Sequence, residues 1–302
     1  MRVVVPPLRL SLRALGSLLH ATLTAWLADR APTMGAALAY YTLFSMAPLL
    51  LIAIGLAGAL FGVEAARTEI LAQLQTLLGA DGAQAVASLL RSVQQHEQSA
   101  YGTVIGVGLL LVGATTVFAE LQDSLDRIWQ VPAHHPSARS ESVSAWWLLL
   151  RTRLMSFGLI LGIGFLLLVS LAVSAAMAAW GRWWAPAFGA WDVLLQSANQ
   201  AFGFGLTATL FALIYKYVPH QRIGWPDVWL GSLFTALLFT VGKVGIGWYI
   251  GSSGVASGFG AAGSLVVLLV WVYWSAQVFL LGAEFTWVFA HRYGSRRALP
   301  AR

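Results

Sequence analysis

The chain has 302 residues, of which 58% are apolar and only 10% are charged, and it contains no cysteine. A soluble domain carries about 25% charged residues, so this composition excludes an ordinary soluble protein and indicates an integral membrane protein. The missing cysteines exclude disulfides, thiolate metal sites and cysteine nucleophiles. The formal net charge of +6 would suit nucleic acid, but the basic residues fall in the loops of one membrane side, so we expect no nucleic-acid partner.

Residues 1–33 are predicted to form a cytoplasmic amphipathic segment that lies in the membrane interface. Leucines recur at helical spacing from Leu8 to Leu23, while Arg9 and Arg13 stand off that stripe. Such a pattern is typical of an interfacial helix. Because arginines interrupt the apolar run, it is not a signal peptide.

Six apolar runs are long enough to cross a hydrocarbon core about 30 Å thick, which takes about 20 helical residues. They lie at about 34–62, 101–119, 154–180, 197–218, 228–250 and 264–287. We therefore predict an all-α polytopic fold with a transmembrane domain over residues 34–290 and a basic tail over 291–302. Residues 64–98 hold two amphipathic stripes separated by Gly79-Ala-Asp-Gly82, which predicts a helical hairpin outside the bilayer.

Six spans place both termini on one side of the membrane, and the basic residues indicate which side. Fourteen of the eighteen Lys and Arg residues fall on the side of the termini, and only Arg67, Arg91 and Arg182 fall on the other. Lys243 is the remaining one and lies inside a span. The positive-inside rule then predicts that both termini are cytoplasmic.

An ionisable side chain at membrane depth costs several kcal/mol, so Lys243 and Glu284 are candidates for function. Lys243 is flanked by glycines at 242, 245 and 247, and its expected neighbours are polar residues at the start of the fourth span or the carbonyls of the glycine-rich turn 251–263. The candidate substrate-binding residues are Lys243, Tyr40, Tyr41, Ser45, Asn199 and Gln200. Each also has a plainer interpretation, because Lys243 can extend its stem to the outer interface and the others can serve helix packing.

Acids and arginines at the predicted cytoplasmic face form a second candidate group. The helical rise places Glu120 about 28 Å below Tyr101 and Glu284 about 31 Å below Gly263, so the two acids reach similar depths. We hypothesise a polar network that closes the inner end of the bundle, made of Glu120, Asp123, Arg127, Arg151, Arg153 and Glu284. The alternative for Glu284 is a solvated or salt-bridged structural glutamate.

The sequence offers no catalytic constellation. Its six histidines are scattered over loops on both membrane faces, whereas a metal-dependent nuclease needs several ligands that converge on one open site. There is no Gly-x-Ser-x-Gly elbow and no phosphate-binding P-loop. We expect no metal, no cofactor and no enzymatic activity.

Several segments resemble the YihY/BrkB family of bacterial inner-membrane proteins. They are Ala36–Pro48, Leu121–Trp129, Tyr217-Val-Pro219, Gly242-Lys243 and Leu280–Phe285, which follow one another along most of the chain. The resemblance implies a six-span fold in a bacterial inner membrane. It also carries an early ribonuclease label, which the residues above do not support, together with labels for virulence and for transport or lipid handling.

These observations favour a permease-like protein that moves or flips a lipid or an amphiphile. A non-transporting scaffold or envelope-maintenance factor is the alternative, and an intramembrane enzyme is the weakest of the three. Transport predicts polar groups that line a path, whereas a scaffold predicts polar groups that are satisfied locally. Membrane lipids are the expected partners, and a homo-oligomer or contacts with other envelope proteins are left open.

Overall fold

The computed structural model describes residues 12–96, 116–131, 191–254, 258–259 and 263–297. Every regular element in this part of the chain is helical, as predicted for an all-α fold. The helices are α1 (Leu12–Ala28), α2 (Ala31–Phe61), α3 (Val63–His96), one over residues 116–128, α6 (Trp191–Tyr217), α7 (Trp225–Ser253) and α9 (Gly263–Arg292). The predicted spans at about 101–119 and 154–180 lie mostly or wholly outside the described residues and stay predictions.

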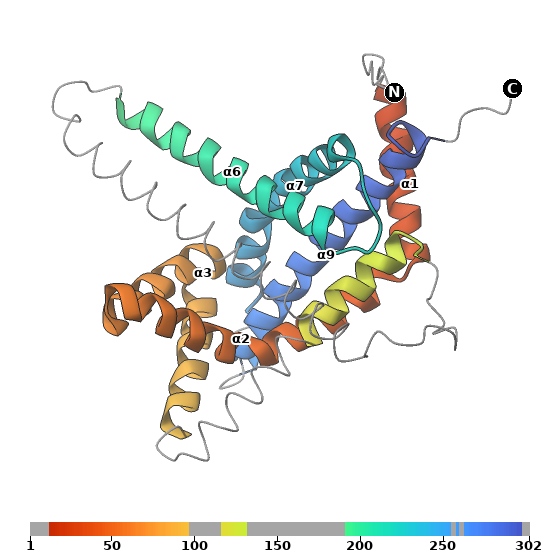
Figure 1. Ribbon diagram of the computed structural model, residues 1–302. Helices are drawn as coiled ribbons and strands as arrows, with labels where there is room; N and C mark the ends of the chain where they lie inside the picture. The colour runs from red at the N-terminus through yellow and green to blue at the C-terminus, as the bar shows by residue number, and fades with distance from the viewer. Residues whose placement is uncertain (1–11, 97–115, 132–190, 255–257, 260–262, 298–302) are drawn as a thin grey trace, which may run out of the picture.

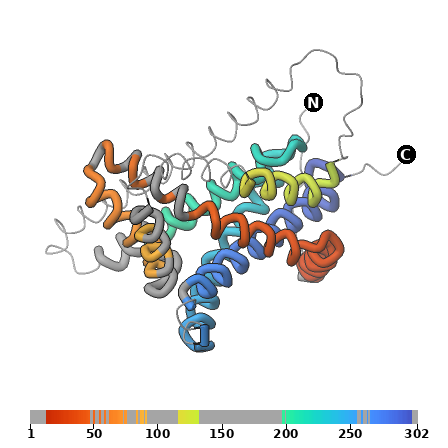
Figure 2. Tube along the Cα trace, turned by 90° about the horizontal axis from the view of Figure 1, so that it is seen from below, coloured from red at the N-terminus to blue at the C-terminus, as the bar shows by residue number. Residues whose placement is uncertain are grey.

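Helix α9 is the element on which the others pack. It contacts α7, α2, α1 and α3, and Figures 1 and 2 show the red α2 crossing the blue α9. Its C-terminal half is buried on nearly all sides, from Val278 to Ala290. A helix that is apolar all round is one enclosed by neighbours, and this half of α9 is therefore the centre of the described bundle.

A left-handed residue separates the first two helices. Arg30 has φ 56° and ψ 38°, and Pro32 stands in the first turn of α2, where its missing N–H costs nothing. The α1 helix then packs along α9 through Leu18 and its neighbours. Arg292 at the end of α9 donates from Nη1 to the Ser17 carbonyl at 3.3 Å, so the start of α1 and the end of α9 lie at the same end of the bundle.

Gly62, at φ 89°, separates α2 from α3, a backbone conformation that glycine adopts without a steric cost. The predicted non-helical break at Gly79-Ala-Asp-Gly82 is not present, because residues 63–96 are helical throughout, but the axis of α3 changes direction within this range in Figure 1. Glycine in a helix costs about 1 kcal/mol relative to alanine, which packing can offset. That packing is visible: Val86 and Leu90 are buried with Leu268 of α9.

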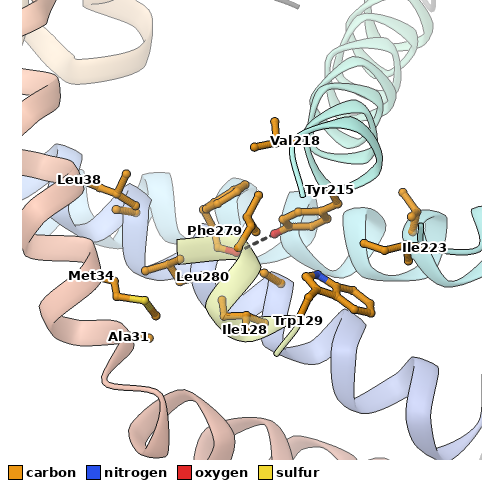
Figure 3. Packing of buried hydrophobic residues seen from close by; sticks show 14 of the residues in the cluster. Ala31, Met34, Leu38, Ile128, Trp129, Tyr215, Val218, Ile223, Phe279 and Leu280 are labelled. Atoms are coloured by element: carbon orange, nitrogen blue, oxygen red, sulfur yellow. Dashed lines mark hydrogen bonds between the residues drawn. The ribbon is translucent and has the colours of Figure 1, made fainter. Parts of the chain in front are cut away.

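The largest cluster of buried residues joins α2, the 116–128 helix, α6 and α9, and Figure 3 shows it from close by. Leu125, Ile128 and Trp129 fill its centre. Tyr215 enters from α6, and its hydroxyl donates to the Phe279 carbonyl at 2.7 Å. This cluster holds together elements that are far apart in the sequence.

Helices α7 and α9 approach closely because glycines face threonines at their crossing. A methyl group added to Gly231 would overlap the Thr286 side chain, and one added to Gly282 would overlap Thr235. Each glycine precedes a threonine by four residues, an arrangement of small residues that lets membrane helices pack closely. Trp225–Ser253 and Leu265–Arg292 are both long and apolar enough to cross a membrane.

Candidate functional site

A polar stripe runs along the buried half of α9. Gln277, Glu284 and His291 are spaced by seven residues, which is close to two helical turns, so they share one face. Glu284 is 0% exposed, and no nitrogen donor among the described residues hydrogen-bonds to its carboxylate oxygens. The Gln277 amide donates to the Pro32 carbonyl at 3.4 Å, while its Oε1 has no partner in the same part of the chain.

Three buried donors near this stripe are also unpaired within the described ranges. They are Trp26 Nε1 on α1, Ser124 Oγ on the 116–128 helix and Trp129 Nε1 just after it. Both tryptophans belong to or pack against the large core cluster. A buried polar group without a partner costs about 1 to 3 kcal/mol, and native proteins hold few of them. The two unpaired tryptophan N–H groups at this core therefore mark it as a candidate site for a polar ligand or for water.

The charged group that acts on Glu284 is another acid. Asp29, beside the left-handed Arg30, is its electrostatic neighbour. Two ionised carboxylates repel each other, and two neighbouring carboxyl groups are accommodated when they share one proton in a hydrogen bond. The α1–α2 elbow and α9 thus hold two acids together where an acid–arginine pair was expected.

Only part of the predicted cytoplasmic network can be compared with the structure, because Arg151 and Arg153 lie outside the described residues. Asp123 and Arg127 are exposed. Burial, and then the charge of Asp123, raise the pKa of the Glu120 carboxyl above its ordinary value. No described contact joins Glu284 to Glu120 or Arg127.

The acid that does bind at this face is Asp126, which the sequence analysis did not single out. Its carboxylate accepts from the His220 backbone N–H at 2.9 Å and lies 2.6 Å from His220 Nδ1. One turn earlier, the Gln122 amide donates to the Val218 carbonyl at 3.0 Å. The spacing of four between Gln122 and Asp126 was the available signal, because it places both on one face of the helix.

The residues after α9 fold back and hold the start of α7, and we call residues 293–297 the C-terminal clasp. Asp227 is buried and accepts from the Ser295 N–H at 3.2 Å and from the Ser295 hydroxyl at 2.5 Å. Arg296 donates to Gln221 Oε1 at 2.8 Å and to the Arg222 carbonyl at 3.1 Å. The guanidinium of Arg296 also lies 5.3 Å from the centre of a Trp129 ring.

The structure does not bring the candidate substrate residues together. Helices α6 and α7 run antiparallel, since Tyr215 contacts Thr235 and Phe211 contacts Phe239. One further step of four residues along each helix places Lys243 of α7 opposite residue 207 of α6. Asn199 is eight residues beyond that level, about 12 Å along the helix axis, and Gln200 is exposed. Lys243 itself is half-buried.

The tyrosine and serine candidates on α2 belong to their own helix. Tyr40 is exposed and its ring contacts Tyr41 and Phe44. Ser45 is buried, and its hydroxyl donates to the Tyr41 carbonyl at 2.8 Å. None of the hydrogen bonds or ring contacts of the described residues joins them to Lys243. Nor do these residues hold a group of three or more His, Asp or Glu that could bind a metal.

Comparison with known proteins gives one consistent result. The family model described as virulence factor BrkB matches residues 22–302. The chain is similar to UPF0761 membrane proteins: one from Pseudoalteromonas translucida is 28% identical over 82% of this chain and 78% of its own length. Another from Alkalilimnicola ehrlichii is 30% identical over 83% of this chain and 53% of its own length. One from Ralstonia nicotianae is 27% identical over 90% of this chain and 59% of its own length.

The chain therefore spans little more than half the length of the last two relatives. No solved structure matches it.

Proposed function

We propose that this chain, which belongs to the virulence factor BrkB family, has a permease-like function and moves or flips a lipid or an amphiphile. Its relatives are named membrane proteins, and it is an integral protein of a bacterial membrane. The finer placement is part of the proposal: the inner membrane, six spans, and both termini in the cytoplasm.

One face of α7 supports its role as a span. Large apolar side chains are exposed along it at intervals of three or four residues, namely Trp229, Leu233, Leu237, Val241, Val244 and Trp248. The stripe covers about 28 Å along the axis, close to the thickness of a hydrocarbon core, about 30 Å. Tryptophan stands at each end, as at the two interfaces of a membrane. This face suits contact with lipid.

The observation that carries the transport proposal is the buried acid Glu284, which has no cationic partner among the described residues. A scaffold would satisfy its interior polar groups locally, yet the neighbour of the buried Glu284 among the described residues is another acid, Asp29, and no described cation pairs with it. Ionisable groups buried in membrane bundles commonly mark a substrate or ion pathway. The polar stripe of α9 and the unpaired Trp26 and Trp129 N–H groups at the large core cluster would offer hydrogen bonds to a passing headgroup.

The crossing of α6, α7 and α9 favours the scaffold as second candidate. Here the Tyr215 hydroxyl is fully engaged, with the Phe279 carbonyl at 2.7 Å and Thr235 Oγ1 at 3.0 Å. Polar groups at this crossing serve packing alone. The proposal assigns no catalytic role to any residue.

A lipid-translocation assay tests the proposal. The purified protein is reconstituted in vesicles with fluorescent phosphatidylglycerol or phosphatidylethanolamine, and the inward-facing label is followed as it becomes accessible to dithionite. We expect wild type to exceed protein-free vesicles. Glu284→Gln should slow translocation about tenfold, since a hydrogen bond to a charged group is worth about 1.5 to 3 kcal/mol.

The matched control is Glu64→Gln, which removes an exposed acid in the first turn of α3 and should leave the rate unchanged. A wild-type rate equal to that of protein-free vesicles for both lipids would leave the scaffold as the better account. Equal slowing by both variants would remove Glu284 from the proposed path.

A further inference from the structure

The turn between α6 and α7 carries cationic and aromatic side chains together. Tyr217 is 62% exposed and Trp225 is 42% exposed, and their ring centres lie 6.3 Å apart in an edge-to-face arrangement. Lys216 Nζ lies 5.4 Å from the Trp225 ring centre. Arg222, within the same turn, is exposed.

Hydrogen bonds fix the backbone of this turn, and its cationic side chains keep N–H groups that can bind a ligand. The Lys216 ammonium donates to the Ile223 carbonyl, which uses one of its three N–H groups. The C-terminal clasp fixes the next position, because Arg296 donates to the Arg222 carbonyl at 3.1 Å. The exposed Arg222 guanidinium is not needed for that contact.

The acidic side chains around the turn already accept hydrogen bonds from other residues. Asp126 is paired with His220 at 2.6 Å. Asp227 is only 2% exposed and binds Ser295. In the described residues 216–227, the exposed Arg222 and the half-buried Lys216 are cationic while the acid Asp227 is engaged, so the surface suits an anion.

The apolar face of α7 begins next to these cations. Trp229 and Leu233 are exposed one and two turns beyond Trp225, and the stripe continues along the helix. A ligand that satisfies both parts has an anionic head at the turn and a hydrocarbon tail along α7. Free phosphate would meet only the first part.

We infer that Lys216, Arg222 and the Tyr217–Trp225 pair bind the headgroup of an anionic phospholipid, with an acyl chain along Trp229 and Leu233. Tyr and Trp favour the headgroup level of a membrane, and juxtamembrane Lys and Arg attract anionic lipid. The inference rests on the proposed role of α7 as a span. The site lies on the outer surface of the α6–α7 pair, apart from the buried polar stripe of α9, and it would hold a resident lipid whether or not the protein transports one.

Native mass spectrometry of the delipidated protein in detergent tests this site, with palmitoyl-oleoyl phosphatidylglycerol as the probe and the matching phosphatidylcholine as the neutral reference. Wild type should retain phosphatidylglycerol in preference. The double variant Lys216→Met/Arg222→Gln should weaken that binding about 25-fold, from about a factor of five for each cation near the surface.

Two further variants separate the loss of a local binding site from misfolding and from a general change in surface charge. Arg222→Gln alone changes an exposed side chain without touching the Ile223 contact, and it should weaken binding about fivefold in a protein that folds as wild type. Arg67→Gln/Arg91→Gln removes the same net charge from α3 and should change binding by less than about twofold if the site is local rather than a general surface charge.

Equal retention of the two lipids by wild type would overturn the inference, as would equal losses in the α3 control. Displacement of the lipid by glycerol phosphate at equal concentration would show a headgroup site without the acyl chain and would also overturn it. The binding measurement does not depend on transport. A wild-type protein that translocates lipid but shows no preference for phosphatidylglycerol would contradict this inference alone. A wild-type protein that prefers phosphatidylglycerol but does not translocate lipid would contradict only the proposed function.

Discussion

Replacing Gly282 by alanine should destabilise the crossing of α7 and α9. The added methyl group would lie 2.6 Å from the Tyr215 hydroxyl and 2.8 Å from Thr235 Cβ, closer than atoms can approach. The neighbours are not flexible ends of surface side chains: Tyr215 and Thr235 are both 0% exposed. Overpacking of a tight interior costs about 1 to 3 kcal/mol, and we expect a loss in that range.

The assay is reversible unfolding of the purified protein in mixed micelles with increasing dodecyl sulfate, followed by tryptophan fluorescence. Gly245→Ala is the matched control, because a methyl group there meets nothing within 4 Å while the helix gains about 1 kcal/mol in propensity. It should be neutral or stabilising. The same glycine-to-alanine change should therefore lower the free energy of unfolding at Gly282 of α9 and leave it unchanged or raise it at Gly245 of α7.

A second substitution tests whether the clash is the cause. Thr235→Ala removes the hydroxyl that Gly282→Ala would overlap, so the double variant should lose less than the sum of the two single losses. Coupling between residues in contact is typically 0.5 to about 3 kcal/mol. Strictly additive losses, or a Gly282→Ala protein as stable as the Gly245→Ala control, would refute the packing described for this crossing.

Three further predictions concern the clasp, the intramembrane lysine and the topology. Asp227→Ala should remove the acceptor of Ser295 and lower stability by about 1 to 3 kcal/mol, with faster proteolysis of the C-terminal residues, whereas Asp123→Ala, an exposed acid, should change neither. Lys243→Met and Lys243→Arg should both abolish complementation of a deletion strain while expression stays normal, because a compact ammonium is not replaced by a planar guanidinium; a fully active Lys243→Met protein would contradict this. Cysteines placed at 80 and 135 should react with an impermeant reagent in intact cells only at 80, and labelling at 135 instead would invert the proposed orientation.

Within the described residues, the sequence by itself indicated where α2 and α7 begin and end to within about one turn. The predicted run 34–62 became α2 (Ala31–Phe61), and the run 228–250 became α7 (Trp225–Ser253). These boundaries depend on residues within one turn of each end, such as Pro226 in the first turn of α7 and Gly62 after α2. Helix length and backbone preference are local properties, so a single chain carries them without knowledge of its fold.

Contacts between distant elements were decided only by the tertiary structure. The sequence predicted an arginine near Glu284, and because Arg151 and Arg153 lie outside the described residues this stays a prediction; the neighbour that only the tertiary structure revealed is Asp29, at the α1–α2 elbow. Asp126 gained its role only when the turn after α6 folded against its helix. The continuity of α3 likewise depends on packing, since Val86 and Leu90 are buried against α2 and α9. Hydropathy and helical period show which face of a helix is apolar, but which neighbour covers that face, and in what register, is set by the combined packing of all the helices.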